Sequence, residues 1–388
     1  MAAQLNFGAW KSGKANQGAS VMCVKSTCPV NTDMIYPTII PQNMGISFSM
    51  PLAKTTIRMA VINAERASGQ FSVAIFTPSD ASDKPITIIM IEYEKLLDKM
   101  RFPADQSKGL QDFDPGYTDL FKGKSEGKSF LKHSVEKLAE LQEVLFAYNR
   151  YSLLIIFQAM DAAGKDGTIK HVMSGVNPQG CMVKSFKKPS EEELDHTYMW
   201  RCYKALPERG QIGIFNRSYY EEVLITRVHP EVLHNQKLPD MPMDPENNNS
   251  FWKSRYNDIN AFEKYLENNG MTVLKFFLNI SKEEQKSRFL KRIENPAKHW
   301  KISLSDFQER QYWDDYMHAY EQMLLNTSTD NAPWYVIPAE HKWFMRSAVS
   351  AIIISKLMSL NLHYPGISDE KKKEMDLRRA IYSAMIDR

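Results

Sequence analysis

Short apolar segments alternate with helical segments from residue 150 onward, and this alternation constrains the fold more than any other feature of the sequence. The first segment, Leu153–Phe157, is apolar throughout, as expected of a strand that is buried on both faces of a parallel sheet. Strands that alternate with helices are typical of a parallel sheet with helices on both faces. The sequence therefore predicts a three-layer α/β fold with five strands, at Leu153–Phe157, Met182–Phe186, Ile212–Phe215, Thr272–Leu278 and Trp334–Ile337.

The helices around these strands are marked by helix-capping residues and by apolar residues three or four positions apart. Leu131, Val135 and Leu138 form such a face, which predicts a helix over Ser129–Tyr148. Capping pairs predict helix starts at Ser190 with Glu193, Ser281 with Glu284, and Ser305 with Gln308. Further helices are expected from Ser218 onward and over Asn249–Asn268, Phe344–Leu360 and Asp369–Ile386.

The loop between the first strand and its helix resembles a phosphate-binding loop. It contains Gly164-Lys165, the dipeptide that closes the P-loop motif, in the required place between a strand and a helix. Backbone N–H groups of such a loop and of the helix N-terminus bind anions, and Lys165 adds a positive charge. We expect phosphate to contact Lys165 and the residues around it, namely Ala163, Gly164, Gly167 and Thr168.

Two carboxylates distinguish this loop from the usual motif. Asp166 stands at the position of the hydroxyl residue that normally binds Mg²⁺, Asp161 adds a second acid, and Ala159 replaces the first glycine. Two acids in an anion-binding loop repel phosphate unless a cation lies between them. The loop therefore predicts Mg²⁺ as a cofactor, held by Asp161 and Asp166 and bridging to a highly charged phosphate.

The segment that follows the third strand stands where P-loop enzymes carry their Walker B acid. Asn216 occupies that position and is neutral, and Arg217 beside it is placed to reach phosphate. Glu221 follows one helical turn later and can supply a carboxylate. We predict catalytic roles for Asn216, Arg217 and Glu221, alongside Asp161, Lys165 and Asp166.

A basic helix, a break at Pro296 and a second capped helix have the layout of a kinase lid, over about residues 282–325. Its cations include Arg288, Arg292, Lys298 and Lys301. A second basic cluster around Lys187 follows the second strand and fits either a polyanion track or a solvated helix start.

Composition excludes several classes of protein. The formal net charge is only +3, from 49 Lys and Arg against 46 Asp and Glu, which excludes a protein that coats nucleic acid. The longest apolar runs are too short for a transmembrane helix. Four cysteines in 388 residues, with no Cys-x-x-Cys pair, favour a reducing compartment. We predict a cytoplasmic protein without nucleic-acid or membrane partners.

These motifs together resemble the polyphosphate kinase 2 family, from about Lys128 to Leu362. The segments on which this resemblance rests are Phe157–Thr168, Asn177–Gly180, Leu206–Pro207, Ile214–Tyr220, Arg227–Pro230, Leu274–Leu278, Asn295–Lys301 and Ala332–Trp334. Asn216, Glu221 and the Arg227–Pro230 segment resemble the class III branch, whose members phosphorylate both AMP and ADP. The resemblance implies a P-loop kinase fold with a helical lid, and Mg²⁺-dependent phosphoryl transfer from inorganic polyphosphate to nucleotides.

The resemblance also implies residue roles and partners. The family's loop residues correspond to Asp161, Lys165 and Asp166, its Walker B segment to Asn216, Arg217 and Glu221, and its basic lid residues to Arg288, Arg292, Lys298 and Lys301. The implied partners are polyphosphate and adenine nucleotides, with guanine nucleotides left open, and a homo-oligomer, either dimer or tetramer.

The domain organisation follows from the extent of this match. Residues 128–362 form the predicted kinase domain, 91–127 a linker and N-terminal segment, and 363–388 a helical tail. Residues 1–90 show no helical period, although Phe71–Phe76 and Ile86–Ile91 each fit a short strand. We expect residues 1–90 to be a disordered extension, or the product of an upstream start, with no catalytic role.

Two other functions fit the same residues. An ATP-dependent nucleoside monophosphate kinase would also use Arg217, although Asp166 at the hydroxyl position argues against it. A regulator that binds nucleotide or polyphosphate without turnover would explain why Asn216 replaces the usual acid. Phosphorylation with ATP as the only donor would indicate the kinase, and tight binding without turnover would indicate the regulator.

Overall fold

The structure, a computed structural model, describes residues 47–52, 55–64, 71–76, 96–239, 241–242, 244 and 248–386. The chain divides into two compact units, Met1–Ile88 and Ile89–Arg388. In the first unit, three antiparallel strands form a sheet in the order β1-β2-β3, with β1 at Ser47–Leu52, β2 at Thr55–Ala64 and β3 at Phe71–Phe76.

The strand predicted at Phe71–Phe76 is confirmed as β3. The strand predicted at Ile86–Ile91 lies outside the described residues. The assignment of residues 1–90 as an extension without a catalytic role stays a prediction, as do the other domain boundaries.

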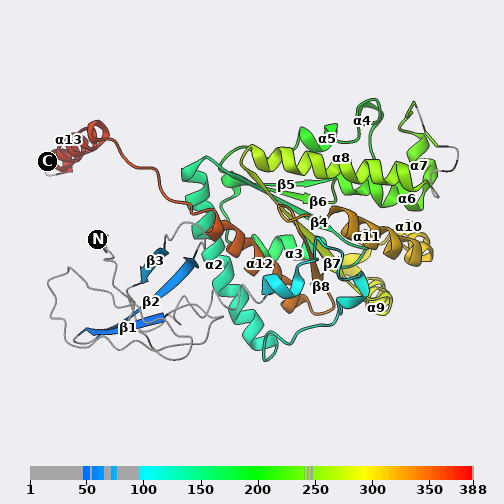
Figure 1. Cartoon of the computed structure of the whole chain (residues 1–388), viewed down its shortest axis with the longest axis horizontal. Coiled ribbons are helices and arrows are strands. Elements are labelled where there is room, and N and C mark those ends of the chain that lie inside the picture. The colour runs from blue at the N-terminus through cyan, green and yellow to red at the C-terminus, as the bar shows by residue number, and fades with distance from the viewer. Residues whose placement is uncertain are drawn as a thin grey trace, which may run out of the picture. The chain divides into compact units, whose positions relative to one another are not determined.

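The second unit is built on a five-stranded parallel sheet in the order β5-β6-β4-β7-β8 (Figure 1). All residues of the central strand β4 are buried, because strands flank both of its edges and helices cover the sheet. From β4 the chain builds one side of the sheet and then crosses to the other, so the carboxyl end of β4 is a topological switch point, where ligands commonly bind in such sheets. The strands are β4 (Ser152–Gln158), β5 (Cys181–Ser185), β6 (Ile212–Asn216), β7 (Met271–Asn279) and β8 (Trp334–Pro338).

The five predicted strands are confirmed, with β5 shifted one residue toward the N-terminus. The three-layer α/β class is confirmed as well. The helix α12 packs against α2, α3 and β8, and α8 packs against β7 and α11 (Figure 1). Residues 347–354 of α12 are all buried, because this helix lies between the sheet and α2. No described helix is both long and apolar enough to cross a membrane.

The helices of the second unit differ widely in length. Residues 96–100 are helical and come before η1 in the chain. The α-helices are α2 (Lys124–Tyr148), α3 (Lys165–Val172), α4 (Glu191–Leu194), α5 (Trp200–Tyr203), α6 (Ile225–Val228), α7 (Pro230–His234), α8 (Asn249–Asn268), α9 (Lys282–Ile293), α10 (Leu304–Glu309), α11 (Trp313–Thr327), α12 (Lys342–Ser359) and α13 (Asp369–Ile386). The 3-10 helices are η1 (Leu110–Asp112), η2 (Pro178–Gly180), η3 (Tyr219–Val223), η4 (Pro296–Lys301) and η5 (Arg310–Tyr312).

The predicted lid region consists of α9, η4, α10, η5 and α11. The cap at Ser281 is confirmed, because its side chain accepts a hydrogen bond from the N–H of Glu284. The predicted cap at Ser305 is wrong: Ser303 caps α10 by accepting from the N–H of Ser305. The 3-10 helix η5 also separates α10 from α11, where the sequence predicted one continuous helix.

A buried ion pair joins α8 to β7 and contacts the segment that follows β6. Lys275 on β7 is fully buried, and its Nζ donates to Glu263 Oε2 at 2.6 Å and to the Thr327 carbonyl at 2.7 Å. Glu263 on α8 also accepts hydrogen bonds from the hydroxyl groups of Tyr219 and Tyr220, at 2.8 Å each. Both tyrosines follow Arg217 closely in the chain, so this cluster fixes the segment that carries Arg217.

We predict that Lys275→Met lowers the free energy of unfolding by about 3–5 kcal/mol, because Glu263 is then left buried without its cation. Adding Glu263→Gln should recover a large part of this loss, since the double variant buries no unpaired charge. Urea denaturation of the single and double variants measures both effects. A double variant that is as unstable as Lys275→Met would contradict this interpretation.

Candidate active site

The loop between β4 and α3 lies at the carboxyl end of the central strand, as a phosphate-binding loop requires. Ala162 and Gly164 both adopt left-handed backbone conformations, with φ of 64° and 114°. Alanine rarely adopts this conformation, so contacts around the loop must hold it there. Lys165 is the first residue of α3, and its Nζ donates to the Ala159 carbonyl at 2.7 Å. Burial lowers the pKa of Lys165, although the nearby Asp161 carboxylate partly opposes this effect.

Some predicted phosphate-binding groups are engaged within the loop itself. The Thr168 hydroxyl donates to the Gly164 carbonyl at 3.0 Å, and the Ala163 N–H donates to the Met160 carbonyl at 3.3 Å. The N–H groups of Lys165, Asp166 and Gly167 have no backbone acceptor within the described part of the chain. These three N–H groups, at the first turn of α3, are therefore free to bind an anion.

The two loop carboxylates face different partners. Asp161 Oδ1 accepts a hydrogen bond from Arg217 Nη2 at 3.0 Å. Asp166 Oδ1 accepts from Asn216 Nδ2 at 2.9 Å, and its Oδ2 lies 3.3 Å from Lys301 Nζ. Burial acts to raise the pKa of Asp166, but the hydrogen bonds from Asn216 and Lys301 outweigh it and hold that pKa below its usual range. Asp166 is therefore ionised at neutral pH.

Asn216 explains how Asp166 is accommodated. A carboxylate at position 216 would face the Asp166 carboxylate at hydrogen-bond distance, where two negative charges repel. The amide instead donates a hydrogen bond to Asp166. Asp166, in the first turn of α3, thus places a carboxylate beside the end of β6, where Asn216 itself is neutral.

Arg217 is held in a defined position by its backbone and its charge partners. Its φ is 64°, and its N–H donates to the Phe157 carbonyl at 3.1 Å. The carboxylate of Glu221, and then that of Asp161, raise the pKa of Arg217 well above its usual range. Glu221 therefore acts on Arg217 electrostatically, and the guanidinium stays charged.

Arg288, predicted to bind phosphate, is instead bonded to the loop backbone. Its side chain is buried, and Nη1 donates to the carbonyls of Ala162 and Ala163, at 3.1 and 2.6 Å. Its Nη2 donates to the carbonyls of Ala339 and Glu340. These contacts hold the strained turn at Ala162 and join it to the end of β8. A phosphate contact by Arg288 stays a prediction that this geometry does not favour.

The other predicted basic residues are placed differently. Arg292 Nη1 lies 3.4 Å from Asp306 Oδ2, and Lys301 contacts Asp166 as described. Lys298 on η4 has no ion-pair partner among the described residues. Lys187 is exposed just beyond the carboxyl end of β5.

The structure adds residues that the sequence analysis missed. Gln285 Nε2 donates to the Asp161 carbonyl at 3.0 Å and accepts from Arg310 at 2.7 Å, so it joins α9 to the loop. Asp306 on α10 has a raised pKa because of burial and then because of the negative charge of Asp161, so it also faces the site. Lys342 and Arg346 begin α12 one turn apart, a spacing that could have been noticed at the end of the fifth strand.

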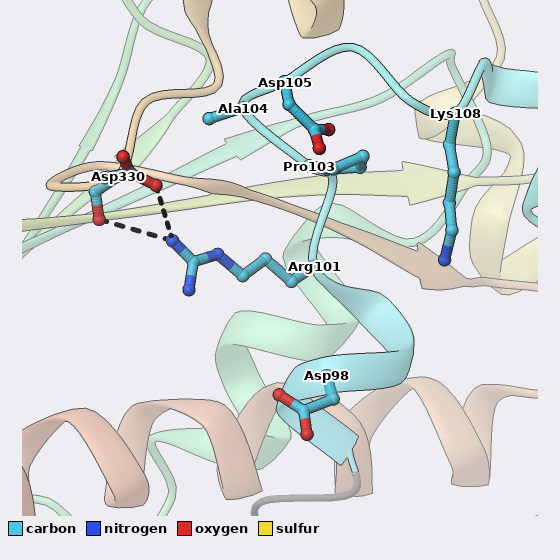
Figure 2. Close-up of a pocket in the computed structure, with 7 residues that line it drawn as sticks. All are labelled: Asp98, Arg101, Pro103, Ala104, Asp105, Lys108 and Asp330. Atoms are coloured by element: carbon cyan, nitrogen blue, oxygen red, sulfur yellow. Dashed lines mark hydrogen bonds and ion pairs between the residues drawn. The ribbon is translucent and has the colours of Figure 1, made fainter.

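A separate cavity of about 560 Å³ lies away from this site (Figure 2). Arg101, in the wall of this cavity, pairs with Tyr335 near the start of β8 through an isolated β-bridge of the backbone. The cavity therefore lies at the amino end of the sheet. Asp330 lies 3.5 Å from the Arg101 guanidinium, and Asp98 and Asp105 add negative charge (Figure 2). This cavity is therefore a poor site for a phosphate compound.

A family model described as Polyphosphate kinase 2 (PPK2) matches residues 122–364. An ADP-polyphosphate phosphotransferase of Rhodopseudomonas palustris is 51% identical over 257 residues, which is 66% of this chain and 88% of that protein. An AMP/ADP-polyphosphate phosphotransferase of Meiothermus ruber is 42% identical over 268 residues, 69% of this chain and 95% of that protein.

A solved structure of Polyphosphate Kinase 2 from Arthrobacter aurescens TC1 is similar to this fold, with a TM-score of 0.67 and 40% sequence identity. The match covers 74% of this chain and 96% of that chain. Sequence and structure comparisons thus agree on one family.

We predict that Arg288→Ala lowers the free energy of unfolding by about 2–4 kcal/mol, because several buried carbonyl groups lose their donor together. Arg292→Ala, on the same helix, is the matched control. It should cost at most about 1 kcal/mol, since its ion pair with Asp306 is long and partly exposed. Denaturant unfolding of both variants makes the comparison, and equal losses would contradict the bracing role of Arg288.

Proposed function

Because the chain belongs to the polyphosphate kinase 2 family, we propose that it transfers phosphoryl groups from inorganic polyphosphate to AMP and ADP, in a reaction that is reversible in principle. The observation that carries the proposal is the pair of carboxylates in the loop, each held by a cation or an amide donor. Together with the free N–H groups of α3 and Lys165, they fit a ligand that brings both negative charge and a bound cation.

The donor set fits Mg²⁺. No group of three or more His, Cys, Asp or Glu side chains that could hold a metal occurs in the described parts of the chain. Magnesium ordinarily binds through one or two carboxylates together with substrate phosphates, rather than in an all-protein cage. Asp161 and Asp166 would hold the ion, which when bound would neutralise charge on the phosphate groups.

The remaining residues position and neutralise the substrates. Lys165 is a single charge at the start of α3 that can leave the Ala159 carbonyl and pair with a phosphate oxygen. Arg217 can stabilise the negative charge that develops on the phosphoryl group in the transition state, while Glu221 orients it. Lys301 reaches the loop from η4, so the lid contributes a charge to the same place.

Use of both AMP and ADP is supported by the class III resemblance of Asn216, Glu221 and the Arg227–Pro230 segment, and by the name of the Meiothermus ruber relative. Assembly as a dimer or tetramer and a cytoplasmic location remain predictions from the family resemblance and the composition. An ATP-dependent monophosphate kinase and a binding protein without turnover are the alternatives that the experiment below separates.

The test is ATP formation, measured with luciferase, from polyphosphate, Mg²⁺ and either ADP or AMP. We expect product from both acceptors. Product from ADP alone would remove AMP from the proposal. Product only when ATP and a monophosphate are supplied together would favour the alternative kinase. No product in any mixture would favour the binding protein.

Lys165→Ala should lower kcat at least about 100-fold in this assay, because a charge that stabilises the transferring phosphoryl group is lost. Lys170→Ala is the matched control, since Lys170 is an exposed lysine on the same helix α3. Near-normal turnover by folded Lys165→Ala protein would show that this loop is not the catalytic site.

A further inference from the structure

The Arg227–Pro230 segment contributes to the family resemblance, but the mechanism above gives it no role. Its His229 separates α6 from α7, and only 15% of that side chain is exposed. The chain reaches His229 from Arg217 through η3 and α6, which pack against each other and against α11 (Figure 1). His229 therefore belongs to the same packed segment as Arg217, which contacts the phosphate loop.

His229 contacts the predicted lid through Glu309, the last residue of α10. Its Nε2 lies 3.0 Å from Glu309 Oε2, and the Tyr316 hydroxyl donates to the same oxygen at 2.7 Å. A carboxylate only accepts hydrogen bonds, so Nε2 of His229 is the donor. Burial, and then the hydrogen bond to Glu309, raise the pKa of Tyr316, so its hydroxyl keeps its proton. Two donors thus hold one carboxylate oxygen in place.

The other neighbours of His229 are an aromatic ring and a second carboxylate. The Tyr312 ring lies edge-on to the His229 ring, with the centroids 4.8 Å apart. Glu231 on α7 places its Oε1 3.3 Å from His229 Nδ1. Because the ring is largely shielded from water, its hydrogen bond to Glu309 is stronger than one between two exposed side chains.

The helix α10 also carries a charge toward the loop. Asp306 lies three residues before Glu309, so the two carboxylates share a face of this helix. Burial, and then the negative charge of Asp161, raise the pKa of Asp306, which places Asp306 near the loop. A contact that holds Glu309 therefore also fixes Asp306 relative to the loop.

A second contact connects η4, which precedes α10, to the loop. Lys301 ends η4, and its Nζ lies 3.3 Å from Asp166 Oδ2. In the proposed function Asp166 holds Mg²⁺, so Lys301 and the ion compete for this carboxylate. The contact between Glu309 and His229 involves neither a proposed metal ligand nor a loop residue, so it can persist when the substrates are bound.

We propose that His229 is a positioning residue, which holds Glu309 and thereby fixes α10 and η4 beside the phosphate loop while the phosphoryl group is transferred. The inference rests on the proposed function and deepens it, because it names the group that keeps Lys301 close to the transferring phosphate. His229 itself touches neither substrate nor metal and acts through Glu309.

We expect His229→Ala to lower kcat about tenfold, because loss of a hydrogen bond to a charged group changes the population of an arrangement by about that factor. The KM for ADP should change less than about threefold, since the contact does not bind substrate. ATP formation from polyphosphate and ADP, followed with luciferase, measures both constants. A raised KM for ADP at unchanged kcat would overturn the inference by assigning His229 to nucleotide binding.

Conservative and paired variants separate the hydrogen bond from ring packing. His229→Gln keeps an N–H that can reach Glu309 but loses the ring, so it should recover most of kcat. Glu309→Ala should match His229→Ala, and the double variant should be no slower than either, since both changes remove one contact. Equal losses in His229→Ala and His229→Gln would contradict the proposal, as would fully additive losses in the double variant.

Glu231→Gln is the matched control, because Glu231 is the other carboxylate beside His229 but belongs to α7 rather than to the predicted lid. Its side chain is 73% exposed, and exposed ion pairs contribute little, so kcat should change less than about twofold. A loss as large as that of Glu309→Ala would overturn the inference, because the effect would then not depend on the lid.

Hydrogen exchange followed by mass spectrometry provides a readout that needs no turnover. We expect faster exchange over residues 296–309 in His229→Ala and in Glu309→Ala, with exchange in β4 and β7 as in the native protein. Unchanged exchange over residues 296–309, in variants of an enzyme that does use polyphosphate, would overturn the inference and leave the proposed function intact. A native protein that transfers no phosphoryl group would overturn both.

Discussion

The Asp166 carboxylate accepts a hydrogen bond from Asn216 and lies beside Lys301. These contacts keep Asp166 negatively charged, and the other charged groups of the site are arranged around that charge. An ionised acid at the first turn of α3 places negative charge where helix N–H groups attract anions. Asp161 adds a second negative charge, balanced by Arg217. This arrangement suits the proposed ligand, which carries both phosphate and a cation. The hydrogen bonds from Asn216 and Lys301 favour the ionised form of Asp166.

A rigid surround keeps these groups in place. Arg288 donates to the carbonyls of Ala162 and Ala163 and so stabilises a turn that alanine adopts only under constraint. On the other side, the Lys275–Glu263 pair binds the two tyrosines that follow Arg217. The predicted lid segment thus makes two kinds of contact with the loop: Arg288 of α9 donates to its carbonyl groups, while η4 brings Lys301 next to Asp166, where we propose that the substrate binds. Only a contact of the second kind was expected from the run of basic residues.

The sheet could be predicted from the sequence because burial on both faces leaves continuous apolar runs, as in Leu153–Phe157. The position of the loop could be predicted because Gly164 and Lys165 follow an apolar run and precede a helical segment. The role of Arg288 could not, since a basic side chain in sequence does not reveal whether carbonyls or phosphates will surround it. Lys342 and Arg346 were missed because they stand at the start of a helix whose apolar residues dominate its pattern.

The central claim is that the loop carboxylates hold a cation between the protein and the phosphate. Crystals grown with Mn²⁺ in place of Mg²⁺ and with polyphosphate test it directly, because anomalous scattering locates the metal. We predict an anomalous peak between the carboxylates of Asp161 and Asp166 and a phosphate oxygen, and loss of this peak in Asp166→Asn. Phosphate bound at the first turn of α3 with no metal near either carboxylate would contradict the account.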